Sequence, residues 1–540
     1  MKYFFCSLLI LLLFFHRGVY AQQSHFFLDS NLHYQFFQSG LAKVSQKTTV
    51  TNLNSEFQPS NIVTTLGFLD LKNVSASDRF GAIFPVVNVS SQSSQITIAP
   101  HQPGAGINRK TTVNLVYQTE SLMQKLGNIY VISIPAPNPN ESYTIYDIVV
   151  DSKELGTPIF VDPPTTKNTW HLDQIKTSGI TLLYWSQQSR VQDYFVSIKY
   201  VLTNKKLYSV NGQINLPFDS LGQTVAIEKL NPPPNQVRID PSGNWVANYY
   251  LSPNASQTVL LESRIQLTQP DRIASNSSVL AKQAYKNTLE QLSSSSGQTV
   301  SCQLASKTLA NELKKNQINS RYVLGNLFPT RNALHCWIEY LDPESYTWLS
   351  ADPYLAYLTK HGGYLDFWDP LHIKLVTTVD SQNNLSNVSE IVVKPAGFDS
   401  PFPKNSQLDL RADFGKTTIS GFQYSGKIYL QNSGSTALNN LKLVVSTKKV
   451  PVIKTHVSIA TLPPMGTMQL TVDLEKVPWT FAQDDIITLE INGRDYSYPV
   501  SFIPIYQSST FLTVGGLFVI TAIFIITQIS RSLFFQRQKK

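Results

Sequence analysis

Cysteine is scarce in this chain of 540 residues, which contains only three. Cys6 lies in a segment that we expect to be removed as a signal peptide, so Cys302 and Cys336 are the two cysteines of the mature protein. Two cysteines exclude a disulfide-rich scaffold, although a single bridge between them stays possible. The chain also lacks paired-cysteine spacing and His-Glu-x-x-His, so we predict neither a metal site nor a cofactor.

Charged residues are also few, at 15% of the chain. The net charge is +8, but the basic residues are scattered along the sequence. Nucleic-acid-binding proteins usually concentrate Lys and Arg in a stripe, often with aromatic residues between them. No such stripe is present, and we predict no nucleic-acid partner.

The N-terminal residues have the pattern of a secretory signal peptide. Lys2 supplies a positive charge, residues 4–15 are apolar, and small residues precede Gln22. This order predicts a signal peptide over residues 1–21. The alternative is an uncleaved N-terminal anchor, because His16 and Arg17 follow the apolar run.

The C-terminal residues predict a membrane span. Residues 511–529 contain no charge, and a helix of this length rises about 28 Å, enough to cross a hydrocarbon core. We therefore predict a transmembrane helix over residues 510–530. The basic tail, residues 531–540, is expected to be cytoplasmic by the positive-inside rule, with the bulk of the chain on the outer side of the cell membrane. The alternative is a buried helix of a soluble protein.

Between these ends, the hydrophobic pattern changes twice. Short runs with period-two alternation, such as residues 194–201, predict two β-sandwiches over residues 22–162 and 163–268. Helical spacing followed by strand-like segments predicts a small α+β domain over residues 269–395. Strands return in residues 396–507, where we expect an immunoglobulin-like sandwich. The predicted class is a multidomain, mainly β protein with one transmembrane helix.

Cys302, His335 and Asp352 form the candidate catalytic site. A thiol can attack a carbonyl, an imidazole can take up and return the proton, and a carboxylate can fix the imidazole tautomer. Ser301 or Thr299 can cap the helix that begins at Cys302, and the helix dipole would lower the thiol pKa. The alternative is packing, because Cys302 continues an apolar helical stripe through Ala305, Leu309 and Leu313.

The alternation of side chains along a strand bears on whether Cys302 meets His335 or Cys336. In a strand over residues 333–341, His335 shares a face with Trp337 and Glu339, whereas Cys336 points to the opposite face. If His335 faces Cys302, Cys336 points away into packing, which argues against a Cys302–Cys336 disulfide unless a bulge intervenes. Asp352 follows the next strand and can reach the other ring nitrogen of His335. Alternatively, Asp352-Pro353 is simply a turn opener.

These motifs resemble the transglutaminase-like superfamily, over about residues 280–369. They are a cysteine at a helix start, Arg321-Tyr322-Val323-Leu324-Gly325, His-x-Trp-x-Glu at His335 and Trp-x-x-x-Asp-Pro ending at Pro353. The downstream run 359–367 is similar to exported bacterial members with β-sandwiches and a C-terminal span. The resemblance implies a papain-like fold, with Cys302 as nucleophile, His335 as general base and acid, and Asp352 as the orienting carboxylate.

The sequence departs from the family pattern near Cys302. Val300 replaces a frequent glycine, and Gln303 and Leu304 replace acidic or aromatic residues. No motif identifies the oxyanion donor, for which the Cys302 backbone N–H and the Gln298 side chain are candidates.

The predicted activity is that of a thiol enzyme that acts on amide bonds of a peptide or protein. The acyl group of its thioester intermediate can be transferred to water or to an amine. We favour hydrolysis because water needs no second binding site. The remaining histidines are unpromising as site residues. The alternative is a catalytically inactive surface protein that uses the same fold for binding or as a scaffold.

Overall fold

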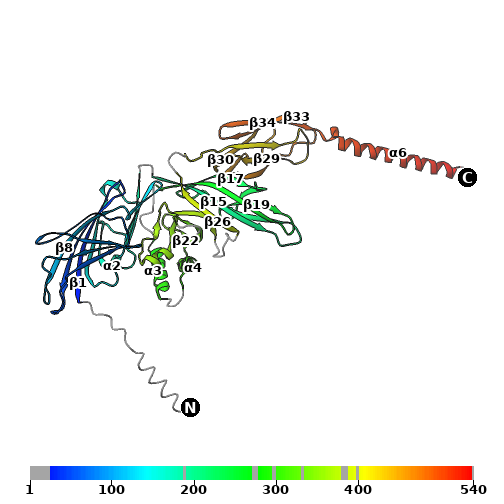
Figure 1. Ribbon diagram of the computed structural model, residues 1–540. Coiled ribbons are helices and arrows are strands. Elements are labelled where there is room, and N and C mark those ends of the chain that lie inside the picture. The colour runs from blue at the N-terminus through cyan, green and yellow to red at the C-terminus, as the bar shows by residue number, and fades with distance from the viewer. Residues whose placement is uncertain are drawn as a thin grey trace, which may run out of the picture.

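A computed structural model describes residues 25–186, 190–270, 278–294, 299–329, 334–378, 387–396 and 401–537. β-strands dominate, and a single long apolar helix ends the described chain (Figure 1). This is the multidomain, mainly β class that the sequence predicts. The predicted signal peptide, residues 1–21, and Gln298 lie outside the described residues.

The N-terminal part consists of three sheets around one core. A seven-stranded sheet has the order β13-β11-β1-β2-β8-β4-β5, and smaller sheets have the orders β12-β14-β10-β9 and β3-β7-β6. Their core runs from Leu32 to Tyr184, so it continues past the boundary predicted between residues 162 and 163. The elements are β1 (Phe26–Phe36), β2 (Ala42–Asn52), β3 (Ile62–Leu66), β4 (Lys72–Asp78), β5 (Gly81–Ile83), β6 (Val86–Val89), β7 (Ser94–Ile98), β8 (Lys110–Thr119), β9 (Met123–Leu126), β10 (Ile129–Ile134), β11 (Tyr143–Asp151), η1 (Lys153–Leu155), β12 (Phe160–Asp162), β13 (Thr169–Trp170), α2 (Leu172–Ile175) and β14 (Ile180–Trp185).

A second β-sandwich follows. Its sheets have the orders β17-β20-β15-β26 and β16-β19-β18. The predicted alternation holds in β15, where Tyr194, Val196, Ile198 and Tyr200 are buried in its core. The strand β26 lies beyond the central domain in sequence but pairs with β15, so the chain returns to this sandwich before residue 396. The elements are β15 (Val191–Thr203), β16 (Val210–Leu216), β17 (Gln223–Asn231), β18 (Gln236–Ile239), β19 (Trp245–Leu251), β20 (Ser256–Thr268) and β26 (Val388–Pro395).

The central domain has the predicted α+β composition. Its antiparallel sheet has the order β24-β23-β22-β21-β25, and α4 packs against β21 and β22 while contacting α3 and α5. Leu309 and Leu313 of α4 share a core with Ile338 and Tyr340 of β22. Figure 1 shows α3 and α4 grouped beside β22. The elements are α3 (Val279–Ser294), α4 (Cys302–Lys315), β21 (Ser320–Leu327), β22 (Leu334–Leu341), β23 (Trp348–Ala351), α5 (Pro353–Thr359), β24 (Leu365–Phe367) and β25 (His372–Thr378).

A third sandwich precedes the apolar helix. Its sheets have the orders β27-β29-β32 and β28-β34-β33-β30-β31. The hairpin predicted at Asn492-Gly493 joins β33 and β34, and both turn residues have positive φ, as a two-residue hairpin turn requires. The elements are β27 (Leu408–Asp413), β28 (Thr417–Ile419), β29 (Tyr424–Asn432), β30 (Leu438–Thr447), β31 (His456–Leu462), β32 (Thr467–Leu474), β33 (Gln483–Ile491), β34 (Arg494–Ile503), η2 (Ile505–Gln507) and α6 (Ser509–Arg537).

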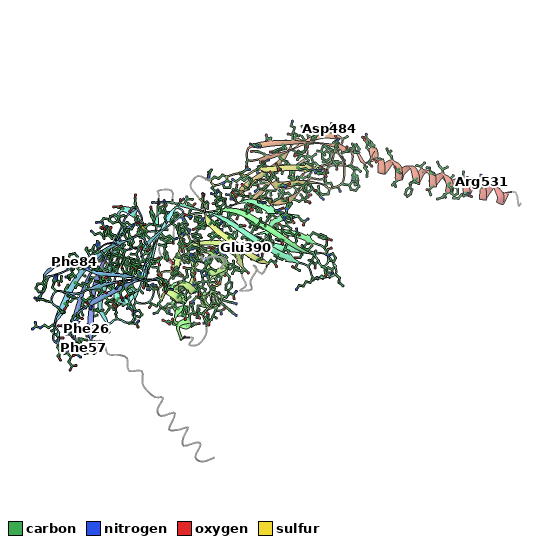
Figure 2. The ribbon with its side chains drawn as sticks, in the orientation of Figure 1. Phe26, Phe57, Phe84, Glu390, Asp484 and Arg531 are labelled. Carbon is green, nitrogen blue, oxygen red and sulfur yellow. A yellow bond between two sulfur atoms is a disulfide. The ribbon has the colours of Figure 1, made fainter. Side chains whose placement is uncertain are left out.

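The helix α6 projects away from the sandwiches, with Arg531 towards its far end (Figure 2). The stretch from Phe511 to Arg531 has a mean hydropathy of 2.2, and none of its residues is buried within the protein. A bare apolar helix of this length is long enough to cross a bilayer. The helix therefore has the length and composition that the sequence prediction of a membrane anchor requires.

Candidate functional site

Cys302 is the first residue of α4, as predicted. The hydroxyl of Ser301 caps this helix by accepting the Leu304 N–H at 3.2 Å. The sulfur of Cys302, however, is bonded to Cys336, with the two Cα atoms 5.5 Å apart. The expectation that Cys336 points away from Cys302 is therefore wrong.

The reason lies in which face of β22 the helix α4 covers. Alternation places Cys336, Ile338 and Tyr340 on one face and His335, Trp337 and Glu339 on the other. The helices pack on the Cys336 face, where Cys302 and Cys336 cluster with Leu324 and Val376. Among the described residues, no hydrogen bond joins Cys302 to His335. The alternation was predicted correctly, but Cys302 meets the Cys336 face.

His335 and Asp352 do lie together as predicted. His335 Nε2 contacts Asp352 Oδ2, and both side chains are buried. Asp352 follows β23 and caps α5, where its Oδ1 accepts the N–H groups of Tyr354 and Leu355, each at 3.0 Å. One carboxylate therefore does both: Oδ1 caps the helix that opens after the turn, and Oδ2 contacts His335.

The charge state of Asp352 follows from its partners. Burial alone would raise the pKa of this carboxyl, but its hydrogen bonds to His335 and His372 outweigh burial and lower the pKa to about 2. Asp352 is therefore ionised at neutral pH. Because its Oδ2 engages Nε2 of His335, the ring nitrogen left for a reacting group is Nδ1.

His372 belongs to the same cluster, and the sequence analysis missed it. Its Nε2 lies 3.4 Å from Asp352 Oδ2, and its Nδ1 lies 2.8 Å from Asp369 Oδ2. Burial would lower the pKa of His372, but Asp369 and Asp352 raise it to about 9. A usable signal existed in the sequence: Asp369-Pro370 repeats the Asp-Pro pair of Asp352-Pro353, and His372 follows two residues after Pro370.

Glu339 supports the sheet beside this cluster. It is 1% exposed and pairs with Arg321, at 2.7 Å, and with Lys374. Burial would raise the Glu339 pKa, but Lys374 and Arg321 hold it below its usual range. The guanidinium of Arg321 also lies 4.2 Å from the ring centre of Trp348. The motif residues Arg321, Glu339 and Trp348 thus fix the sheet around the site.

Aromatic rings and a small cavity surround the cluster. The His335 ring stacks on Trp337 at 5.9 Å, and the His372 ring meets Trp337 at 5.1 Å and Phe367 at 4.7 Å edge-on. A cavity of about 50 Å³ lies beside them, lined in part by Trp337, Trp368, Asp369 and His372. Within the described residues, His335, Asp352 and His372 are the group whose donor atoms could hold a metal ion.

Comparisons with known proteins do not name a family. No protein-family model and no curated sequence matches the chain. Solved structures match only distantly. The CARDB domain of the PF1109 protein from Pyrococcus furiosus is 11% identical, with 20% of this chain and 98% of that one covered, at a TM-score of 0.16.

Two peptidase-type structures are equally remote. Yeast LTA4 hydrolase in complex with bestatin is 11% identical, with 30% of this chain and 28% of that one covered, at a TM-score of 0.21. An M1 zinc metallopeptidase from Deinococcus radiodurans is 12% identical, with 49% and 52% covered, at 0.16. The chain thus spans less than a third of the hydrolase and about half of the metallopeptidase. These scores carry no inference about activity.

Proposed function

We propose that this protein is a membrane-anchored, transglutaminase-like thiol enzyme that acts on amide bonds outside the cytoplasm. The observation that carries the proposal is the buried His335–Asp352 pair. Asp352 occupies Nε2 of His335, which leaves Nδ1 as the nitrogen that could accept a proton from a thiol. Cys302 lies at the capped start of α4 and is bonded to Cys336, the residue that follows His335 in β22.

The disulfide makes the activity conditional on reduction. A dithiol reductant attacks the Cys302–Cys336 bond, forms its own disulfide and leaves two thiols. The proposal requires the freed Cys302 thiol to leave the Cys336 face of β22 and reach Nδ1 of His335. The positive end of the α4 dipole favours the thiolate, because Cys302 is in the first helical turn.

The reaction itself has two steps. The Cys302 thiolate attacks the amide carbonyl, and His335 gives its proton to the departing amine as the C–N bond breaks, leaving a thioester. Water, deprotonated by His335, then attacks the thioester, and the carboxylic acid and the thiol are released. The Cys302 backbone N–H is the candidate oxyanion donor among the described residues, whereas Gln298 lies outside them. Transfer to an amine would follow the same first step.

The test uses the full-length protein in membranes and a peptide vinyl sulfone, which forms a thioether with a nucleophilic cysteine. Wild type should be labelled at Cys302 only after reduction. C336A should be labelled without reductant, because Cys302 then has no disulfide partner, and C302A should not be labelled at all. The proposal is wrong if C336A reacts no faster than a denatured control.

The disulfide itself favours a second candidate, a non-catalytic surface protein with the central domain as a scaffold. The bridge joins α4 to β22 across a sequence separation of 34 residues. In the chain-entropy model, closing a loop of this size stabilises the fold by about 3–4 kcal/mol. If this is its only role, C336A should lose stability by a similar amount and stay unreactive towards the vinyl sulfone.

A further inference from the structure

Three side chains that are distant in sequence bring their donor atoms close together. His335 comes from β22, Asp352 from the start of α5 and His372 from β25. All three are buried, and their donor atoms lie within 4.8 Å of one another. Two imidazoles and one carboxylate form a donor set typical of transition-metal sites in proteins.

Hydrogen bonds fix the orientation of the two imidazoles and of the Asp352 carboxylate. Both imidazoles direct Nε2 towards Asp352 Oδ2. The other carboxylate oxygen of Asp352 accepts the N–H groups of Tyr354 and Leu355, so Oδ2 is the oxygen turned towards the rings. A site whose donors are positioned by the backbone loses little freedom when an ion binds.

His372 also has the outer partner that metal-binding histidines usually have. Its Nδ1 faces Asp369 Oδ2 at 2.8 Å, and Asp369 Oδ1 accepts the N–H groups of Leu371 and His372 at 2.7 and 2.9 Å. A carboxylate behind the imidazole holds the proton on Nδ1, so a metal that binds Nε2 takes the place of the Nε2 proton, and the carboxylate makes the imidazole a stronger ligand. The aromatic rings of Trp337 and Phe367 pack edge-on against His372 and limit how far its ring can turn.

The spacing suits a tetrahedral ion. Ligand atoms about 2.1 Å from zinc lie about 3.4 Å apart in a tetrahedral site. His372 Nε2 and Asp352 Oδ2 are 3.4 Å apart in this structure. His335 Nε2 is closer to Oδ2, so its ring would move back to admit the ion, with a fourth position left for water or a substrate group.

We propose that His335, Asp352 and His372 bind a divalent transition-metal ion, zinc by its donor set, with Asp369 as a positioning residue. The binding does not rest on the thiol-enzyme proposal, because the three ligands are in place with the Cys302–Cys336 bond intact. The two uses of His335 exclude each other, since a metal on Nε2 displaces Asp352 from the position that orients the ring for a thiol. Metal would therefore inhibit the thiol chemistry.

The test uses the full-length protein in detergent, without reductant and freed of metal by a chelator. Cobalt(II) should bind at one ion per chain with visible absorption bands of a four-coordinate site, and zinc should displace it. H372Q should weaken cobalt binding by at least 100-fold, and D369N by about 10- to 100-fold. H171Q should leave binding unchanged, because His171 forms an exposed pair with Asp147 on the N-terminal domain.

X-ray absorption of the zinc-loaded wild type tests the ligands without any substitution. The proposal predicts two imidazoles with oxygen and no sulfur. It is overturned by sulfur ligation, by an absence of saturable binding, or by cobalt binding that H372Q and H171Q affect equally. None of these outcomes depends on thiol labelling, so a failure here is distinct from a failure of the proposed activity.

Discussion

Asp352 shows how one residue combines a structural and a chemical role. One carboxylate oxygen caps α5, and the other faces His335 and His372. The sequence predicted its place beside His335 because Asp352 follows the strand next to that of His335, and strand ends and alternation can be derived from a single sequence. His372 could not be placed in the same way, since it approaches from β25, which lies two strands from β22 in the sheet.

At the residue scale, Glu339 should contribute measurably to stability. Its charge is buried between Arg321 and Lys374, and removing one member of a buried ion pair typically costs about 3–5 kcal/mol. We expect E339Q to lower the hydrogen-exchange protection of β21 and β22 by an amount of that order. The control is E290Q, because Glu290 forms an exposed pair with Lys286 that should contribute less than about 1 kcal/mol. Equal protection in the two variants would contradict this assignment.

The same residue predicts a pH dependence. The folded-state pKa of Glu339 is lowered, so its contribution is present above its unfolded value, about 4.3, and is lost as the pH falls through the folded value. Between pH 7 and pH 3, the protection of β21 and β22 should therefore fall more in the wild type than in E339Q. Parallel losses in the two proteins would show that Glu339 does not carry this pH dependence.

At the element scale, the position of α4 determines which residue of β22 Cys302 meets. The helical stripe of Ala305, Leu309 and Leu313 and the alternation of β22 were both predictable from the sequence, and both are present. The face of β22 that the helix covers was not, because alternation defines two faces without saying which one meets a given helix. The Cys302–Cys336 bond follows from that choice, and a pattern within one strand cannot predict it.

Gly325 should be essential to the central sheet. It pairs with His335 on one side and Lys374 on the other, and an added Cβ would lie 2.1 Å from the Ile373 carbonyl oxygen and 2.6 Å from the Trp337 ring. G325A should therefore force β25 away from β21 and lower the free energy of unfolding by about 1–3 kcal/mol. Protection of β21 and β25 against hydrogen exchange measures this loss.

Gly67 supplies the matched control for that substitution. A Cβ at Gly67 would meet no atom within 4 Å, and its φ is not in the positive region. G67A should leave protection unchanged. If G325A and G67A behave alike, the close approach of β21 and β25 is not a constraint on the fold.

At the scale of the whole molecule, α6 is the helix that is long and apolar enough to cross a membrane. The residues from Phe511 to Arg531 are mostly apolar and none is buried within the protein, so exposure of this helix to water would be unfavourable. The predicted sidedness, with residues 531–540 in the cytoplasm, follows from charge bias alone. The folded domains could be predicted as mainly β, but the extent of the first core and the return of β26 to the second sandwich depend on contacts between distant segments.

Removal of residues 509–540 should release the protein from membranes. A variant that lacks only residues 532–540 should stay bound, because it keeps the apolar stretch. Fractionation of membranes in carbonate buffer measures both. A shortened chain that still pellets with membranes would mean that another surface or segment anchors it.

We propose that Cys302 is a nucleophile prepared by α4 and His335. The most direct measurement is the rate of Cys302 alkylation by iodoacetamide as a function of pH in C336A. We expect an apparent Cys302 thiol pKa below the ordinary value of about 8.5 in C336A, and a shift back towards that value when H335N is added to C336A. A Cys302 pKa at or above 8.5 that H335N leaves unchanged would contradict it.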